Sequence, residues 1–370
     1  MIILYILAAL IIIFTILFLR GYLQKKKAKN VEDLINKGMS LDRTGQYELA
    51  LKVYEQAITI KPNNPLAWYY KGRDLSELCR YPEALTAFEK TLAINPDFFL
   101  AWYHKAFILS IFGKLPEALD AYNKAEQLKP DDAQTLFNKG YVLERLGQTS
   151  NALTAYEKAV QLKPDFLPIW LFKGIAQYST GQIEQALQSF DQALKINPDC
   201  VEAWYNKALV FYGTGQYQEA IKTLENSIHL KPDDARGWLL KGLLTSRIQP
   251  LNETLSVFEK VILLKPDNAD AYYSKGLILE SIGYFEEAIK SLTRSIEINT
   301  NADELWLGKS ELLRNQNSLL QALEAFDQAI KLKPDFNLAW YQRGCILEKL
   351  GRFDQAQHAF EKAKQTKNKG

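Results

Sequence analysis

Apolar side chains recur along the chain in two stripes, each with the spacing of an amphipathic helix. Counted in windows of 34 residues from residue 31, positions 4, 8 and 11 are mostly aromatic, small or aliphatic, and positions 20, 24 and 27 repeat this character later in the window. Residues three or four apart lie on one face of an α-helix, so each window predicts two amphipathic helices. Glycine stands at position 15 of most windows, where it ends the first helix and lets the chain reverse. The pattern predicts a string of helical hairpins.

Proline fixes the period of these hairpins. It recurs every 34 residues at position 32, is replaced once by Thr300, and then returns: Pro62, Pro96, Pro130, Pro164, Pro198, Pro232, Pro266 and Pro334. Proline ends the second helix because it pushes the preceding residue out of the helical region. A strict period in this range is typical of a stacked repeat protein. Ten tandem repeats are expected: 31–64, 65–98, 99–132, 133–166, 167–200, 201–234, 235–268, 269–302, 303–336 and 337–370.

The residue types at fixed positions indicate which kind of helical repeat this is. Position 20 is alanine in every repeat but one, where Thr254 replaces it, and position 24 is tyrosine, phenylalanine or leucine. Position 4 is aromatic in most repeats: Trp68, Trp102, Trp170, Trp204, Trp238, Tyr272, Trp306 and Trp340. This pattern resembles the tetratricopeptide repeat family over residues 31–370. The sequences of the repeats are similar to those of long tandem arrays common in bacteria, particularly cyanobacteria. The resemblance implies an all-α fold, a right-handed superhelical α-solenoid of ten 34-residue helical hairpins.

The charge balance of the chain bears on whether it binds nucleic acid. The chain has 45 basic and 43 acidic residues, and residues 1–30 hold five basic residues and no acidic one, which leaves the repeats slightly acidic. A repeat array that binds nucleic acid needs a basic stripe to neutralise phosphates, and none is visible. We therefore expect no nucleic-acid partner.

The N-terminal segment has the pattern of a membrane anchor. Residues 1–19 are apolar apart from Thr15, and as a helix they would span about 29 Å, close to the thickness of a bilayer core. Arg20 and a lysine cluster follow, whereas a cleavable signal peptide has its basic residues before the apolar run. We expect a transmembrane anchor at residues 1–23 and a basic juxtamembrane linker at 24–30. The positive-inside rule then predicts a single-pass membrane protein with its repeats facing the cytoplasm.

The sequence offers no constellation for catalysis. The three cysteines fall in three different repeats, and the three histidines occupy three different positions in three distant repeats. No set of them has the spacing of metal ligands. Phosphate-binding glycine loops and nucleophile–base motifs are absent from the sequence. We expect no enzyme activity, no cofactor and no bound metal.

Position 7 presents a ladder of cations. It is lysine in nine repeats and Arg343 in the tenth, although it lies on the side of the buried stripe. Position 25 is acidic in eight repeats. In an antiparallel hairpin these positions come level, so we expect the lysine stems to pack on aromatic rings and their heads to pair with position 25, in the same or the adjacent repeat. The alternative is a row of solvated lysines.

The resemblance implies a protein-protein interaction scaffold that binds segments of partner proteins in a concave groove. With the expected anchor, we predict a scaffold for assembly of a membrane complex; the alternative is a regulatory adaptor that recruits a protease or an enzyme to the membrane. In this family, positions 2, 5, 9, 12 and 13 of the first helix line the groove, which implies an aromatic peptide-binding groove in repeats 2–6. Its expected residues are Tyr69, Tyr103, Phe107, Phe137, Tyr141, Tyr178, Tyr205 and Tyr212. The tyrosines at position 5 have an alternative role, packing between neighbouring helices.

Overall fold

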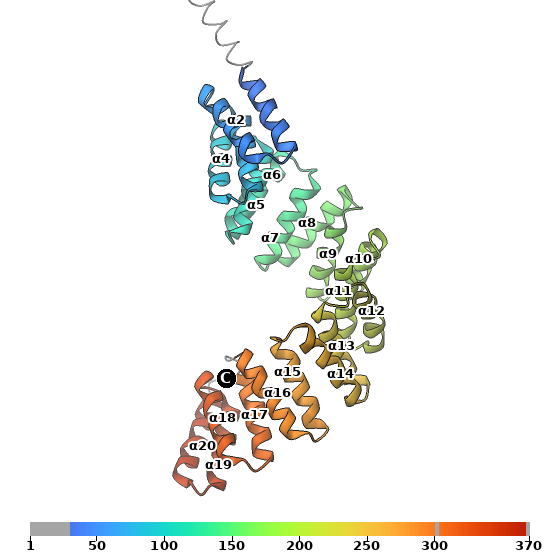
Figure 1. Cartoon of the computed structure of the whole chain (residues 1–370), viewed down its shortest axis with the longest axis vertical. Coiled ribbons are helices and arrows are strands. Elements are labelled where there is room, and N and C mark those ends of the chain that lie inside the picture. The colour runs from blue at the N-terminus through green and yellow to red at the C-terminus, as the bar shows by residue number, and fades with distance from the viewer. Residues whose placement is uncertain (1–29, 300–302, 368–370) are drawn as a thin grey trace, which may run out of the picture. The chain divides into compact units, whose positions relative to one another are not determined.

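The computed structural model describes residues 30–299 and 303–367, and every regular element within these ranges is an α-helix. Residues 30–43 are helical, and the helices after them alternate between the second and the first helix of successive repeats (Figure 1). The first helices are α3 (Pro65–Glu77), α5 (Phe99–Ile111), α7 (Ala133–Arg145), α9 (Leu167–Ser179), α11 (Val201–Gly213), α13 (Ala235–Ile248), α15 (Ala269–Ser281), α17 (Asp303–Asn315) and α19 (Asn337–Lys349). The second helices are α2 (Tyr47–Ile60), α4 (Tyr81–Ile94), α6 (Leu115–Leu128), α8 (Thr149–Leu162), α10 (Ile183–Ile196), α12 (Tyr217–Leu230), α14 (Leu251–Leu264), α16 (Phe285–Ile298), α18 (Leu319–Leu332) and α20 (Phe353–Lys367). The expected all-α class is confirmed.

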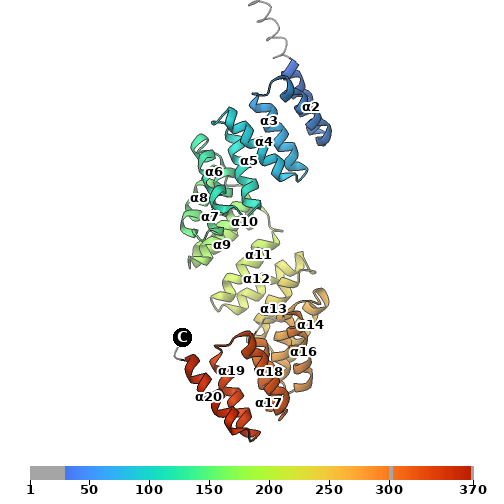
Figure 2. The same ribbon diagram turned by 90° about the vertical axis from the view of Figure 1, so that its left-hand side faces the viewer.

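The chain forms two compact units, residues 1–189 and 190–370, which we call the N-terminal and C-terminal units. The division falls inside α10. Within each unit the densest contacts join the two helices of one repeat, and the next densest join a second helix to the first helix of the following repeat. The turned view shows the same sequential stacking of helices within each unit (Figure 2).

The two helices of a repeat approach closely because position 8 is small. At Gly140, an added Cβ would lie 2.5 Å from Cε1 of Tyr156, the position 24 ring of the same repeat. Tyr156 is fully buried, so the ring occupies the volume that a larger residue at position 8 would need. The same relation holds between Gly72 and Phe88 in the second repeat. Glycine and the ring are therefore one packing unit.

The turn after the first helix requires a left-handed backbone. Gly147 has a φ of +73°, and the glycines at position 15 of six other repeats are similar. Two repeats without this glycine keep the conformation, with φ of +57° at Cys79 and +62° at Asn317. The seventh repeat instead has an extended Gln249 before Pro250, and its first helix α13 is one residue longer than the first helices of repeats 2–6 and 8–10. Side chains are tolerated at this turn at the cost of backbone strain.

At six seams a tryptophan links a repeat to the end of the one before it. The indole Nε1 of Trp102 donates to the carbonyl oxygen of Pro96 at 2.7 Å, which satisfies a carbonyl left free at the end of α4 and explains the tryptophan at position 4. Five other seams have the same bond at 2.8–2.9 Å: Trp68–Pro62, Trp170–Pro164, Trp204–Pro198, Trp238–Pro232 and Trp340–Pro334.

The predicted ion-pair ladder is confirmed, and its pairs join adjacent repeats. Position 7 pairs with position 25 of the preceding repeat at six seams: Lys71–Glu55 (2.8 Å), Lys105–Glu89 (3.1 Å), Lys207–Asp191 (2.6 Å), Lys241–Glu225 (3.6 Å), Lys275–Glu259 (2.9 Å) and Arg343–Asp327 (2.6 Å). The cations also lie over the position 4 rings, as Lys71 does 5.7 Å from the Trp68 ring centroid. Lys173 makes no ion pair among the described residues, although Glu157 stands at position 25 before it.

The expected anchor at residues 1–23 and most of the linker at 24–30 lie outside the described residues; Asn30 is helical. Over the described ranges, no helix combines the length and apolar character needed to cross a membrane.

Candidate peptide-binding groove

The first helices of the N-terminal unit present an aromatic surface on the side opposite their buried stripe. With 3.6 residues per turn, positions 2, 5, 9 and 13 point away from positions 4, 7 and 11. Phe107 of α5 and Tyr141 of α7 both stand at position 9, and their side chains are 43% and 38% exposed. Large aromatic side chains left this open on neighbouring helices form a candidate binding surface.

These rings border a pocket of about 500 Å³ formed by α5, α7 and α9, with Tyr122 added from α6. Its wall is mostly aromatic and aliphatic, with a few polar groups at the edge: Phe107, Ser110, Ile111, Tyr122, Phe137, Asn138, Tyr141, Arg145, Pro168 and Phe172. We call this pocket the aromatic groove. Phe172 holds its far side, with its ring centroid 5.5 Å from those of both Phe137 and Tyr141. The nearly perpendicular ring contacts fix these side chains, so the groove is formed in advance of any ligand.

Arg145 places a positive charge at the edge of the aromatic groove. Its Nη1 donates to the carbonyl oxygen of Ser110 at 3.2 Å, which ties α7 to α5. Its guanidinium carbon lies 5.9 Å from the Tyr141 ring centroid. Asn138, another polar residue of the wall, uses its Nδ2 to donate to Tyr103 Oη at 3.0 Å. A ligand therefore meets an apolar interior with one cation at its edge.

A second pocket of about 340 Å³ adjoins the aromatic groove, because Phe107 lines both. Its walls come from α3, the turn after it and α5: Arg73, Ser76, Glu77, Cys79, Tyr81, Tyr103, His104 and Phe107. His104 Nε2 lies 3.3 Å from Tyr69 Oη, and its ring stacks on Phe88 with centroids 5.5 Å apart. Burial, with a smaller contribution from the Arg73 charge, lowers the pKa of His104 to about 4, so the imidazole is neutral.

The predicted groove residues divide into three groups. Phe107, Phe137 and Tyr141 meet in the aromatic groove, and Tyr103 lies beside it with its hydroxyl bonded to Asn138. Tyr69 is buried, so its ring packs between helices, as the alternative for position 5 had it.

The other three predicted residues lie outside the aromatic groove. Tyr178 is half-buried at the end of α9. Tyr205 and Tyr212 belong to the C-terminal unit. Tyr205 lies under the Arg236 guanidinium, at 5.4 Å, and Tyr212 lines a separate pocket of about 280 Å³ together with Arg247.

The prediction from the sequence did not name seven of the ten residues that line the aromatic groove, and three of these seven matter most for its chemistry. Phe172 and Asn138 stand at position 6, which helical periodicity alone would have placed beside position 2 on the groove side. Arg145 stands at position 13, which was already expected to line the groove, and only its charge was overlooked. Among the described residues there is no cluster of three histidine, cysteine or acidic side chains that could hold a metal.

Paired helices, the glycine–ring contact within several repeats and the tryptophan bond at six seams define an α-helical repeat protein with a groove. Family models for the Tetratricopeptide repeat match residues 65–98, 87–120, 133–166, 178–244, 269–301 and 338–367, and one described as TPR repeat matches 43–73 and 112–147. Together these matches cover more than half of the chain, which belongs to the tetratricopeptide repeat family. A model for the Protein prenyltransferase alpha subunit repeat also matches residues 319–350.

Three solved structures are similar to this chain. A MamA RS-1 ArsTM double mutant is 24% identical, covers 46% of this chain and 95% of its own, and has a TM-score of 0.44. YrrB, described as a TPR protein with an unusual peptide-binding site, is 24% identical over 49% of this chain and 94% of its own, with a TM-score of 0.41. Yeast Tom70 is 15% identical over 91% of this chain and 92% of its own, with a TM-score of 0.47. No curated protein matches this chain.

Proposed function

We propose that this chain is a protein-binding scaffold that holds an apolar segment of a partner protein in the aromatic groove. Tetratricopeptide repeat proteins are protein-interaction scaffolds. The observation that supports this site is the pair of half-exposed rings, Phe107 and Tyr141, beside a pocket of about 500 Å³. We place the chain among binding proteins and not among enzymes.

The energetics favour the centre of the groove as the binding hot spot. Fully burying an aromatic side chain contributes about 1.5–3 kcal/mol, and Phe107 and Tyr141 retain much of that surface open to solvent. The polar edge made by Arg145 and Ser110 adds orientation more than affinity. An extended or helical segment with one large apolar side chain would fill the pocket.

Display of random peptides on the purified chain tests the groove. The wild type should enrich peptides with aromatic or large aliphatic residues, and Phe107→Ala with Tyr141→Ala should abolish that enrichment while helicity and melting stay unchanged. The matched control is Tyr284→Ala with Phe353→Ala, a tyrosine and a phenylalanine that are 57% and 68% exposed outside the groove.

The control variant should enrich the same peptides as the wild type. Enrichment that survives loss of Phe107 and Tyr141, but fails when Arg236 and Arg247 are both changed to Glu, would place the binding site in the C-terminal unit.

We further propose that residues 1–23 anchor the scaffold in a membrane, with the repeats in the cytoplasm, where it would serve assembly of a membrane complex. The support is the apolar run before a basic cluster in the sequence. Cys79 is exposed in the fold and Cys200 is buried, so a Cys345→Ser variant offers one accessible thiol. A membrane-impermeant maleimide should label Cys79 only after the cells are opened, and labelling of intact cells would contradict this orientation.

A further inference from the structure

The ion-pair ladder is interrupted at the seam between the eighth and ninth repeats. Position 25 of the eighth repeat is Thr293, whose Oγ1 donates to the carbonyl oxygen of Ile289 at 2.7 Å, within its own helix. Position 28 is Ile296, which is buried. At several other seams the position 7 cation pairs with a carboxylate at position 25 or position 28 of the preceding repeat. Lys309, the position 7 cation of the ninth repeat, has no acidic residue at either of these positions.

The seam between the third and fourth repeats shows how the chain can compensate. Asn123 stands at position 25 there, and Glu126 at position 28 takes over the pairing. Its carboxylate lies 2.6 Å from Lys139 Nζ and 3.3 Å from Lys158 Nζ. At this seam the position 7 ammonium is paired although the usual acidic residue is missing. Lys309 forms no ion pair among the described residues, although the charges of Glu324 and Glu297 act on it from farther away.

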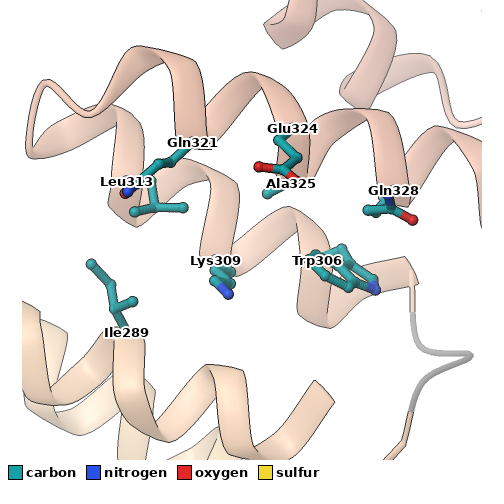
Figure 3. A pocket seen from close by; sticks show the side chains of 8 residues that line it. All are labelled: Ile289, Trp306, Lys309, Leu313, Gln321, Glu324, Ala325 and Gln328. Carbon is teal, nitrogen blue, oxygen red and sulfur yellow. The ribbon is translucent and has the colours of Figure 1, made fainter. Parts of the chain in front are cut away.

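Lys309 lines a pocket of about 560 Å³ between α16, α17 and α18. Its side chain lies in the space between Ile289 of α16 and the Trp306 ring, and its Nζ is 5.5 Å from that ring's centroid (Figure 3). The amides of Gln321 and Gln328 lie on the α18 side. Burial lowers the pKa of Lys309 from its ordinary value, as expected for an ammonium with incomplete compensation.

We propose that this pocket binds a glutamate or aspartate side chain presented by a segment of a partner protein. The carboxylate takes the place that position 25 of the preceding repeat fills at six other seams, where it lies 2.6–3.6 Å from the position 7 cation. Trp306 and Ile289 contact the aliphatic part of the side chain. Position 7 faces away from positions 2, 5 and 9, so this site is separate from the aromatic groove and does not depend on it.

The charges around the pocket favour a peptide over a small anion. Glu324 lines the pocket, and Glu297 nearby is already paired with Arg294 at 2.8 Å. A second carboxylate near Glu324 is repelled unless hydrogen-bond donors lie between them. The amides of Gln321 and Gln328 and the backbone N–H groups of an incoming segment supply such donors, whereas a free carboxylate ion brings none.

Titration of the full chain with two synthetic peptides tests the site. One peptide alternates alanine with glutamate, the other alternates alanine with glutamine, and both have blocked ends. The glutamate peptide should bind the wild type and shift the Lys309 ¹³Cε resonance. Its affinity should fall at least tenfold in Lys309→Met, and equally in Thr293→Glu, which supplies the missing acid within the chain. Lys275→Met, at a seam where Glu259 is present, is the matched control and should bind like the wild type.

Three results would overturn the proposal. The first is unchanged affinity in Lys309→Met or Thr293→Glu when circular dichroism shows both variants folded. The second is equal binding of the glutamine peptide, or no binding of the glutamate peptide at millimolar concentration. The third is competition by sodium acetate at the same carboxylate concentration, which would identify a small-anion site. None of these results bears on peptide capture by the aromatic groove.

Discussion

Arg73 Nη2 lies 3.5 Å from Asp74 Oδ1, and the Asp74 carboxylate is completely buried. Neither oxygen of this carboxylate makes a hydrogen bond, and the Tyr54 hydroxyl in the same region is also without one. Arg73 pairs more closely with Asp42, so a single guanidinium serves two carboxylates. Burial first, and the charge of Asp42 second, raise the pKa of Asp74 to about 7.

Asp74 should make folding less stable as pH rises. Its pKa is above the unfolded value of 3.8, so the folded state binds the extra proton, and its stabilising contribution is present below pH 3.8 and lost as pH rises through about 7. Asp74→Asn should therefore be more stable than the wild type above pH 7, by the order of a few kcal/mol, with the difference vanishing near pH 4. Urea denaturation at several pH values measures this difference. Asp74→Val should give the same pH profile, and a difference that is constant with pH would refute the assignment.

His104 should make the folded state less stable as the pH falls, which is the opposite of the effect of Asp74. Its pKa is depressed to about 4 from 6.5, so the stability contributed by the neutral ring is present above pH 6.5 and is lost as pH falls through about 4. Titration of its ring resonances by NMR should give a midpoint near 4. The variant His104→Gln should flatten the acid limb of the stability curve. A midpoint near 6.5 in the folded chain would show that the ring is solvated.

The glycine–ring contact predicts opposite effects for two similar substitutions. Gly140→Ala should destabilise, because overpacking costs about 1–3 kcal/mol while alanine recovers only about 1 kcal/mol of helix propensity. At Gly308, within α17, the nearest atom to an added Cβ is 4.0 Å away. Gly308→Ala should therefore stabilise by about 0.5–1 kcal/mol. Hydrogen exchange in α7 and α17 measures each effect locally, and equal signs for the two variants would contradict the packing argument.

Single pairs of the ladder should contribute little to stability. Glu55 is 57% exposed in its pair with Lys71, so solvent screens the attraction. Lys71→Met should change the unfolding free energy by less than about 1 kcal/mol, and the effect should shrink in 1 M salt. Denaturation at low and high salt checks this. A loss of several kcal/mol that is insensitive to salt would indicate that the lysine stem and its packing on Trp68 dominate.

The period and residue classes of the sequence determine the helices and seams, because each repeat contacts only its neighbours through the same positions. Phe107 and Tyr141, which stand at the same position of neighbouring repeats, line one pocket for this reason. For Tyr69 the sequence left two roles open, and the structure decides between them, since its burial depends on contacts with Phe98 and His104.

The sequence alone marks Asp74 as unusual, because it is a carboxylate at a position that is apolar in later repeats. It stands at position 10, where eight later repeats place buried apolar residues: Ile108, Val142, Ala176, Val210, Leu244, Ile278, Leu312 and Ile346. A carboxylate in that column is a local conflict with the fold, and such conflicts mark strained or functional positions. That Asp74 shares Arg73 with Asp42 could be seen only in the structure, because the three residues come from two repeats.

The bond from Trp102 to Pro96 allows a whole repeat to be gained or lost without loss of the contacts between its neighbours. The indole and the carbonyl stand on either side of a seam and at fixed positions, so excision of one 34-residue block brings an equivalent pair together. Removal of residues 133–166 would present Trp170 to Pro130, whereas removal of one residue fewer would shift the indole around its helix by about 100°. A gene for such a chain can therefore lengthen or shorten by recombination between repeats without redesign of its joints, and the groove can gain or lose one pair of helices at a time.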